Sequence, residues 1–232
     1  MKIAMWSGPR NLSTAMMYAF ENRVDFAVWD EPFYAPYLKL TGVNHPMAAK
    51  ILATHEVDAE LVSARCFDTI PDEKPHFYMK HMPHHMIGSM PLDWSKDCVN
   101  IHLIRHPARV IASYGVKRDN ITNYDIGFSA QATLFDKIGG LVIDSGDIRQ
   151  DPEKMMRKLC GMINLPFDPA MLEWPAGPRK ADGIWGSYWY NVVHKSTGFA
   201  GAEGPLPALT GDNLILLKNA LPIYEKLAAY KI

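Results

Sequence analysis

The stretch of sequence that decides the fold runs from Ile3 to Thr14 and reads IAMWSGPRNLST. Its first four residues are apolar, as in a short buried strand. Apolar residues then recur at helical spacing at Leu12, Ala15, Met16, Ala19 and Phe20. The sequence therefore predicts a strand that ends at Gly8-Pro9 and a helix that begins near Ser13.

This strand, loop and helix can hold an anion. The first N–H groups of a helix have no intrahelical partners and lie at the positive end of its dipole. Arg10, Ser13 and Thr14 stand beside them. The layout is that of a P-loop, although the Gly-Lys-Ser/Thr signature of nucleoside triphosphatases is absent. The same residues also fit a capped helix after an edge strand, in which the two hydroxyls only accept hydrogen bonds from the first backbone N–H groups of the helix.

The composition bounds the class of protein. The chain has 232 residues, 48% hydrophobic and 21% charged, as expected for one globular domain over residues 1–232. The formal net charge is −1, so we expect no nucleic-acid or membrane partner and a local anion site. Cys66, Cys98 and Cys160 lack disulfide or metal-ligand spacing. With no secretory or long apolar segment in the sequence, a reduced, cytoplasmic protein is expected.

Strand and helix patterns alternate along the chain. Apolar runs predict strands at residues 3–6, 26–29, 77–79, 99–104 and 141–143. Helical spacing predicts helices at 12–20, 47–70, 107–114, 126–138, 151–163 and 214–228, the last a closing helix with a kink or restart at Pro222. Residues 166–207 are rich in Gly, Pro and Trp, and this composition predicts a long loop region. The alternation is typical of a three-layer α/β domain with a mostly parallel central sheet of about five strands.

Polar clusters follow four of the predicted strands: residues 7–14, Asp30-Glu31, 80–85 and Arg105. Ligands of parallel sheets bind at the carboxyl ends of the strands. We therefore expect these clusters to converge on one site.

The loop Pro9-Arg10-Asn11-Leu12-Ser13-Thr14 resembles the Pro-Lys/Arg-Ser-Gly-Thr-Thr loop of sulfotransferases. That family has a fold like that of P-loop nucleoside triphosphatases, and the loop binds the 5′-phosphosulfate of 3′-phosphoadenosine 5′-phosphosulfate. The resemblance implies that Arg10 is the loop cation and that Ser13 and Thr14 are the hydroxyl pair. Asn11 and Leu12 replace Ser-Gly, and a loop without that glycine wraps a phosphate differently.

The segment 105–113, RHPARVIAS, resembles a second sulfotransferase element, in which an Arg ends a strand and a Ser follows eight positions later. In the family both residues hold the 3′-phosphate, which here implies Arg105 and Ser113. The geometry is reasonable in itself, because the Ser lies about two turns into the next helix and an Arg fork matches phosphate oxygens. The alternative is that Arg105 and Arg109 form surface ion pairs.

Two residues are candidates for the base that accepts the acceptor's proton. Lys80-His81-Met82-Pro83 resembles the Lys-Thr-His-Leu-Pro segment of the family, with His81 in the place of the catalytic histidine. Glu31, followed by Pro32, resembles the Glu-Pro after the second strand of bacterial sulfotransferases, where the Glu can serve as base. The sequence does not choose between Glu31 and His81. His84 and His85 extend a His-x-x-His-His pattern, but without a suitably spaced acid or cysteine we expect no metal site.

A late segment resembles the Arg-Lys-Gly element that closes over the nucleotide in the family. The resemblance implies that Arg179 and Lys180 add cations for the 3′-phosphate. Four aromatic side chains of this region either stack on adenine, line the acceptor pocket or form a hydrophobic cluster under the loop: Trp185, Tyr188, Trp189 and Tyr190.

Taken together, the resemblance implies a sulfuryl transfer from 3′-phosphoadenosine 5′-phosphosulfate to a hydroxyl or amine of a small-molecule acceptor, without a metal. Two alternatives remain. One is a P-loop small-molecule kinase, for which Arg10 would have to replace the usual lysine. The other is a non-catalytic nucleotide-binding relative. The sequence specifies neither the acceptor nor the oligomeric state.

Overall fold

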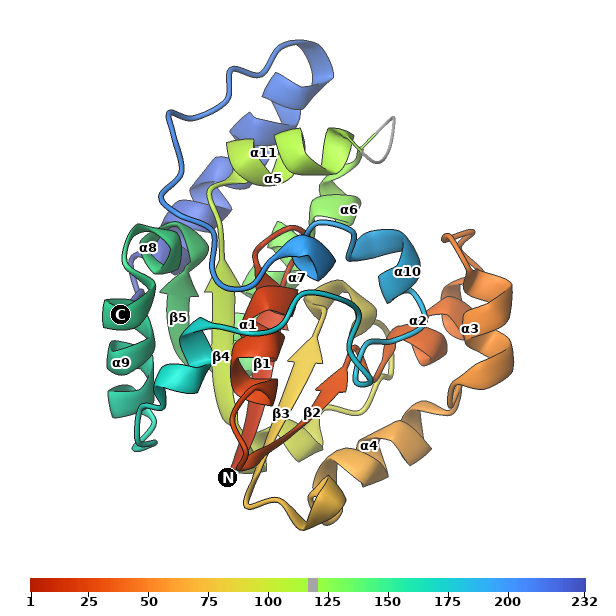
Figure 1. The fold of residues 1–232 in the computed structure, drawn as a ribbon. Helices are drawn as coiled ribbons and strands as arrows, with labels where there is room; N and C mark the ends of the chain where they lie inside the picture. Colours follow the sequence, from red (N-terminus) through yellow and green to blue (C-terminus); the bar gives the residue numbers. More distant parts are fainter. Residues whose placement is uncertain (117–120) are drawn as a thin grey trace.

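The structure, a computed structural model, describes residues 1–116 and 121–232. Within these residues five strands form one sheet in the order β2-β3-β1-β4-β5, and every neighbouring pair is parallel (Figure 1). The strands are β1 (Lys2–Ser7), β2 (Phe26–Asp30), β3 (His76–His81), β4 (Val99–Ile104) and β5 (Leu141–Asp144). Each contains the run that the sequence predicted, so the predicted parallel sheet of about five strands is confirmed.

Helices cover both faces of the sheet. The longer ones are α1 (Ser13–Glu21), α2 (Tyr34–Thr41), α3 (Ala48–Thr54), α4 (Ala59–Phe67), α5 (Pro107–Gly115), α7 (Phe128–Ile138), α9 (Pro152–Met162) and α11 (Gly211–Ala228). Short helices are α6 (Asn123–Ile126), α8 (Ser145–Gln150), α10 (Gly186–Trp189) and the 3-10 turns η1 (Pro71–Glu73), η2 (Pro83–His85), η3 (Asp93–Asp97), η4 (Pro169–Leu172) and η5 (Val193–Lys195). None of the helices in the described part of the chain is long and apolar enough to cross a membrane.

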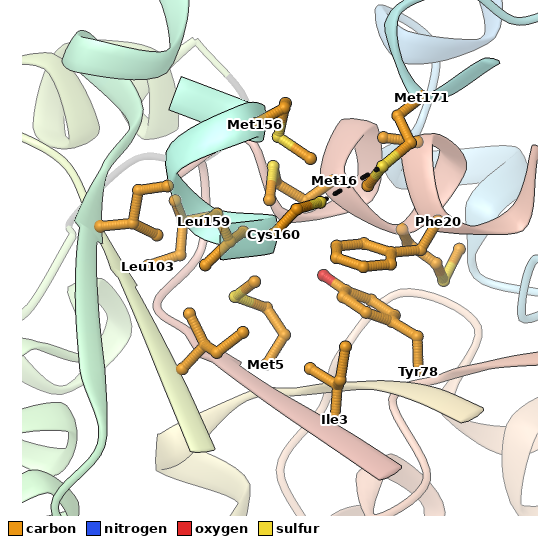
Figure 2. Close-up of a cluster of buried hydrophobic side chains, with 14 of the residues drawn as sticks. Ile3, Met5, Met16, Phe20, Tyr78, Leu103, Met156, Leu159, Cys160 and Met171 are labelled. Atoms are coloured by element: carbon orange, nitrogen blue, oxygen red, sulfur yellow. Dashed lines mark hydrogen bonds between the residues drawn. The ribbon is translucent and has the colours of Figure 1, made fainter. Parts of the chain in front are cut away.

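The two faces of the sheet carry separate hydrophobic cores, because successive residues of a strand point to opposite faces. Ile3 and Met5 of β1 face the core made with α1 and α9 (Figure 2). Ala4 and Trp6 face the second core, made with α4 and α7. In the first core, Phe20 of α1 stacks on Tyr78 of β3 with 4.6 Å between ring centroids. These two cores make the three layers that the alternating pattern predicted.

Several local details differ from the sequence-based expectation. The helix expected over residues 47–70 is two helices, α3 and α4. Asp58 begins the second, because its carboxylate accepts the N–H groups of Glu60 and Leu61. The helix α2 was not expected, although Pro36 lies in its first turn, where a proline is tolerated. The helix α11 runs unbroken through Pro222.

Candidate active site

A cavity of about 400 Å³ opens at the carboxyl ends of β1, β2, β3 and β4. Residues 9–15, which comprise the end of the loop after β1 and the first turn of α1, form one wall of it. Glu31 and Lys80 reach the cavity from β2 and β3, and Arg105 reaches it from β4. The polar clusters that follow the strands in the sequence therefore meet in one place.

The anion loop, residues 7–15, is fixed to the sheet and α7 by hydrogen bonds of buried amide side chains. Asn11 is buried, and its Nδ2 donates to the Leu103 carbonyl of β4 at 3.2 Å. Gln131 of α7 accepts the N–H of Gly8 at 3.2 Å and donates to the carbonyls of Trp6 and Leu103 at 3.1 Å. Sequence analysis did not identify Gln131, because a single glutamine on a helix carries no local signal.

The backbone of the anion loop is left-handed at two residues that are not glycine. Arg10 has φ 63° and Leu12 has φ 78°. Leu12 stands where the resembling loop has its glycine, so the chain reaches the glycine-like conformation with a side chain present. That side chain packs against the core between the sheet and α1. Because a leucine offers no acceptor at the N-cap, its side chain leaves the first N–H groups of α1 uncapped.

Arg10, Arg105 and Ser113 lie together beside the loop. Arg10 Nε donates to Ser113 Oγ at 2.9 Å. Arg105 Nη1 donates to the Arg10 carbonyl at 2.7 Å. Burial and the neighbouring charge of Arg105 lower the pKa of Arg10. The structure thus brings together the two positively charged elements that the sequence singled out.

One carboxylate joins three arginines at the same end of the cavity. Glu203 Oε1 pairs with Arg105 Nη2 and lies 2.6 Å from Arg149 Nη1, while Oε2 lies 2.9 Å from Arg109 Nε. The ion pairs expected of Arg105 and Arg109 in the alternative interpretation therefore exist, but their partner is a side chain only 7% exposed. Sequence analysis identified neither Arg149 nor Glu203.

A buried charged network lies under the other end of the cavity. Lys80 is 1% exposed, and its Nζ lies 2.8 Å from Asp30 Oδ1 and 2.6 Å from Glu31 Oε1. It also donates to the Tyr190 hydroxyl at 2.6 Å, and that hydroxyl lies 2.7 Å from Asp30 Oδ2. Burial alone lowers the pKa of Lys80, but the charges of Asp30 and Glu31 outweigh it and the pKa is raised.

The same network sets the ionisation of Glu31. Burial is the largest influence and raises its pKa, the charge of Lys80 opposes this, and the charge of Asp30 adds to it. The net result is a carboxyl group whose pKa lies above its ordinary value. A carboxylate at a cavity with a raised pKa is suited to accepting a proton.

The two candidate bases are placed differently. Glu31 lines the cavity, whereas His81 does not. The His81 ring is enclosed by Trp6 and Trp94, each with its centroid 4.6 Å away, and by Phe33 at 6.0 Å. Burial and the nearby Lys80 charge lower the pKa of His81 to about 3. His81 faces the second core because it is the last residue of β3 and continues the alternation of that strand.

Neutral rings form the remaining wall of the cavity. His84 and His85 line it, and burial lowers the pKa of His84 to about 4 and that of His85 well below its usual value. Within residues 1–116 and 121–232, no group of three or more acidic, cysteine or histidine side chains is placed to hold a metal ion.

Trp189 and Tyr190 line the cavity too, while Trp185 is buried behind it and donates to the Tyr190 hydroxyl at 3.1 Å.

Arg179 and Lys180 lie outside the cavity lining. The Arg179 guanidinium packs over the Tyr18 ring at 4.9 Å and lies 3.7 Å from Glu21 Oε2, near the C-terminal end of α1. The structure therefore does not bring these two cations to Arg105. Arg149 of α8 occupies the position beside Arg105 instead.

Comparison with known proteins gives one family. A family model described as "Sulfotransferase domain" matches residues 1–231. The fold is similar to the "Sulfotransferase Domain from the Curacin Biosynthetic Pathway" (15% identity, TM-score 0.56, 94% of this chain and 96% of that chain). It is also similar to a sulfotransferase from Alicyclobacillus acidocaldarius (12% identity, TM-score 0.56, 99% and 95% of the two chains).

Two curated proteins of Arabidopsis thaliana are similar in sequence. They are named "Branched-chain-amino-acid aminotransferase-like protein 2" and "Branched-chain-amino-acid aminotransferase-like protein 1", and are 33% and 32% identical over 98% of this chain. The chain spans 41% and 42% of their lengths. Their names therefore describe proteins more than twice as long as the matched region.

Proposed function

The chain belongs to the sulfotransferase domain family, and from this premise we propose that it transfers a sulfuryl group from 3′-phosphoadenosine 5′-phosphosulfate to a hydroxyl or amine of a small molecule. One observation carries the proposal. The anion loop, the Arg105–Ser113 pair and the Glu31 carboxylate all line a single cavity. The cavity therefore joins groups suited to binding the donor with a group suited to taking the acceptor's proton.

The residues at the cavity fit the anionic parts of the donor. The uncapped N–H groups at the start of α1 and the Arg10 guanidinium suit the 5′-phosphosulfate, since both favour negative charge. Arg105 and Ser113 suit the 3′-phosphate. The hydrogen bond of 2.9 Å between Arg10 and Ser113 supports placing the two subsites side by side.

The proposed step is an in-line displacement at sulfur. The acceptor oxygen or nitrogen forms a new bond to sulfur, while the bond between sulfur and the bridging oxygen of the 5′-phosphate breaks. The proton of the acceptor passes to the Glu31 carboxylate, and adenosine 3′,5′-bisphosphate leaves. Arg10 and the loop N–H groups stabilise the negative charge that develops on the leaving phosphate oxygen.

We assign the base to Glu31 because it reaches the cavity and because its pKa is raised. Lys80 and Tyr190 fix the position of its Oε1 through contacts of 2.6 and 3.2 Å. His81 lacks this access and is given no catalytic role. The neutral rings of His84, His85 and Trp189 then offer a surface for an uncharged part of the acceptor.

The proposal is tested by binding and then by turnover. Adenosine 3′,5′-bisphosphate at 100 times its dissociation constant should stabilise the fold by about 2.7 kcal/mol in a thermal-shift experiment. ATP with Mg²⁺ at the same concentration should not. Transfer of ³⁵S from the labelled donor to a panel of phenols, alcohols and amines measures the activity. Preferential stabilisation by ATP with Mg²⁺ would indicate a kinase, and nucleotide binding with no transfer would indicate a non-catalytic relative.

A further inference from the structure

Glu203 pairs with three arginines at one end of the cavity. Its carboxylate meets the guanidinium groups of Arg105, Arg109 and Arg149, which together form the arginine cluster. Three positive charges thus face one negative charge, which leaves two positive charges in excess. Arg105 Nε is also buried and has no hydrogen-bond partner among the described residues.

The segment that carries Glu203 is held mainly through acceptor oxygens. Residues 199–210 contain neither helix nor strand. The Gly201 carbonyl accepts from Arg149 Nε at 2.9 Å, and the Gly204 carbonyl accepts from Arg109 Nη2. Ala200, Gly201 and Ala202 are exposed, as are Gly204 to Leu206. Because residues 200–206 bury little apolar surface, oxygens from another source could replace their own at small cost.

Two of the three arginines reach the cavity. Arg105 and Arg149 line it together with Gly198 and Ala200, so the cluster is continuous with the space assigned to the donor. Burial by itself raises the pKa of Glu203, but the hydrogen bond from Arg105 and the charges of the three arginines outweigh it and lower the pKa. Glu203 is therefore a charged carboxylate, held as an anion by cations that face the donor site.

We propose that the arginine cluster is the pocket for a phosphate monoester of the donor, and that Glu203 fills it in the free protein and is displaced when the donor binds. This inference rests on the proposed function, and under that function the group is the 3′-phosphate. Arg149 then becomes a donor-binding residue, in place of the cations that the sequence suggested at Arg179 and Lys180.

Charge explains why the exchange is favourable. A phosphate monoester carries about −1.5 to −2 charges at neutral pH and three acceptor oxygens. It therefore neutralises the cluster better than one carboxylate with two oxygens. A nucleotide without a 3′-phosphate cannot displace Glu203. Because the carboxylate competes only for the arginine cluster, it should weaken the binding of nucleotides that carry a 3′-phosphate and leave the binding of other nucleotides unchanged.

Binding by variants tests the proposal. Dissociation constants of adenosine 3′,5′-bisphosphate and adenosine 5′-phosphate would be measured for the wild type, Glu203→Gln and Arg149→Gln. Glu203→Gln should bind the bisphosphate about tenfold more tightly, and Arg149→Gln about 10- to 100-fold more weakly. Adenosine 5′-phosphate should bind all three proteins alike. Arg157→Gln is the matched control, because Arg157 lies on α9, outside the cavity lining, and contacts the exposed Glu153 and the Phe167 ring.

A second measurement uses the unaltered chain, in case Glu203→Gln fails to fold. Hydrogen exchange of peptides within residues 199–206 should increase when adenosine 3′,5′-bisphosphate binds and stay unchanged with adenosine 5′-phosphate. Inorganic phosphate serves as a third ligand, and an equal effect from it at equal concentration would overturn the assignment to the donor.

The possible failures are distinct. If the wild type binds neither nucleotide, the proposed function and this inference both fail. If the bisphosphate binds with unchanged or reduced exchange in 199–206, Glu203 stays in place and this inference alone is wrong. Equal weakening of both nucleotides by Arg149→Gln would likewise reject the inference and leave the proposed function standing.

Discussion

Lys80 and Glu31 form an ion pair between neighbouring strands, with 2.6 Å between Nζ and Oε1. The pairing of β2 with β3 sets Asp30 opposite Lys80. The N–H of Glu31 then donates to the Lys80 carbonyl at 2.9 Å. Glu31 is thus fixed by both backbone and side chain. Glu31 is therefore held in place to receive a proton, and burial raises its pKa although the charge of Lys80 opposes that shift.

Glu31→Gln should lower turnover by roughly 10²–10⁴-fold and leave the affinity for adenosine 3′,5′-bisphosphate nearly unchanged. The amide keeps the shape of the side chain but cannot accept the proton. In the wild type, turnover should rise with pH through the pKa of Glu31, which burial places above 4.5. Steady-state kinetics across pH measure both effects. Wild-type turnover in the glutamine variant would exclude Glu31 as the base.

Arg10→Met should reduce turnover by roughly 10²–10³-fold, as expected when one preorganised donor at a developing charge is removed. Methionine keeps much of the apolar stem and deletes the charge. Binding of adenosine 3′,5′-bisphosphate should fall much less, because the charge matters most as the leaving phosphate develops. Measuring kcat and the dissociation constant of adenosine 3′,5′-bisphosphate for the variant separates the effect on turnover from the effect on binding. An equal loss in both would assign Arg10 to ground-state binding.

Leu12→Gly and Leu12→Ala form a matched pair that measures strain in the anion loop. Both changes remove the contacts of the leucine with the core, but only glycine relieves the left-handed conformation at φ 78°. The glycine variant should be more stable than the alanine variant by about 1 kcal/mol in urea unfolding. If alanine proved equal or better, the left-handed backbone at Leu12 would carry no strain.

Acid should destabilise the fold through its buried histidines. Burial lowers the pKa of His81 to about 3 and the pKa of both His84 and His102 to about 4, from 6.5. Below pH 6.5 the unfolded chain binds protons that the folded chain does not. The contribution of the neutral rings is therefore complete above that pH and is lost as pH falls toward 3–4.

His81→Phe isolates one of these groups. The ring still fills the space between Trp6 and Trp94, but it cannot be protonated. Between pH 7 and pH 5 the variant should lose less unfolding free energy than the wild type, by on the order of 2 kcal/mol. Urea titrations at the two pH values measure this. Its turnover should stay close to that of the wild type, and parallel pH dependence of the two proteins would contradict the neutral, buried state of His81.

The sequence by itself determined the scaffold of the site. The five strands and the helix after the first loop follow from local apolar spacing, because period and turn residues act over short distances. The anion loop and Arg105–Ser113 also lie where the sequence placed them, since each follows directly from the end of one strand. These features can be predicted without knowing which distant residues pack against them.

Only the tertiary structure decided which of the remaining residues meet. Glu31 and His81 both follow or end a strand, but strand alternation turns His81 into the aromatic core and leaves Glu31 at the cavity. Arg149 and Glu203 lie 54 positions apart, and a short helix and an irregular segment bring them together at 2.6 Å. Arg179, next to Lys180 in a plausible motif, packs over Tyr18 instead. Such contacts depend on packing between elements far apart in the chain, and no local pattern encodes that packing.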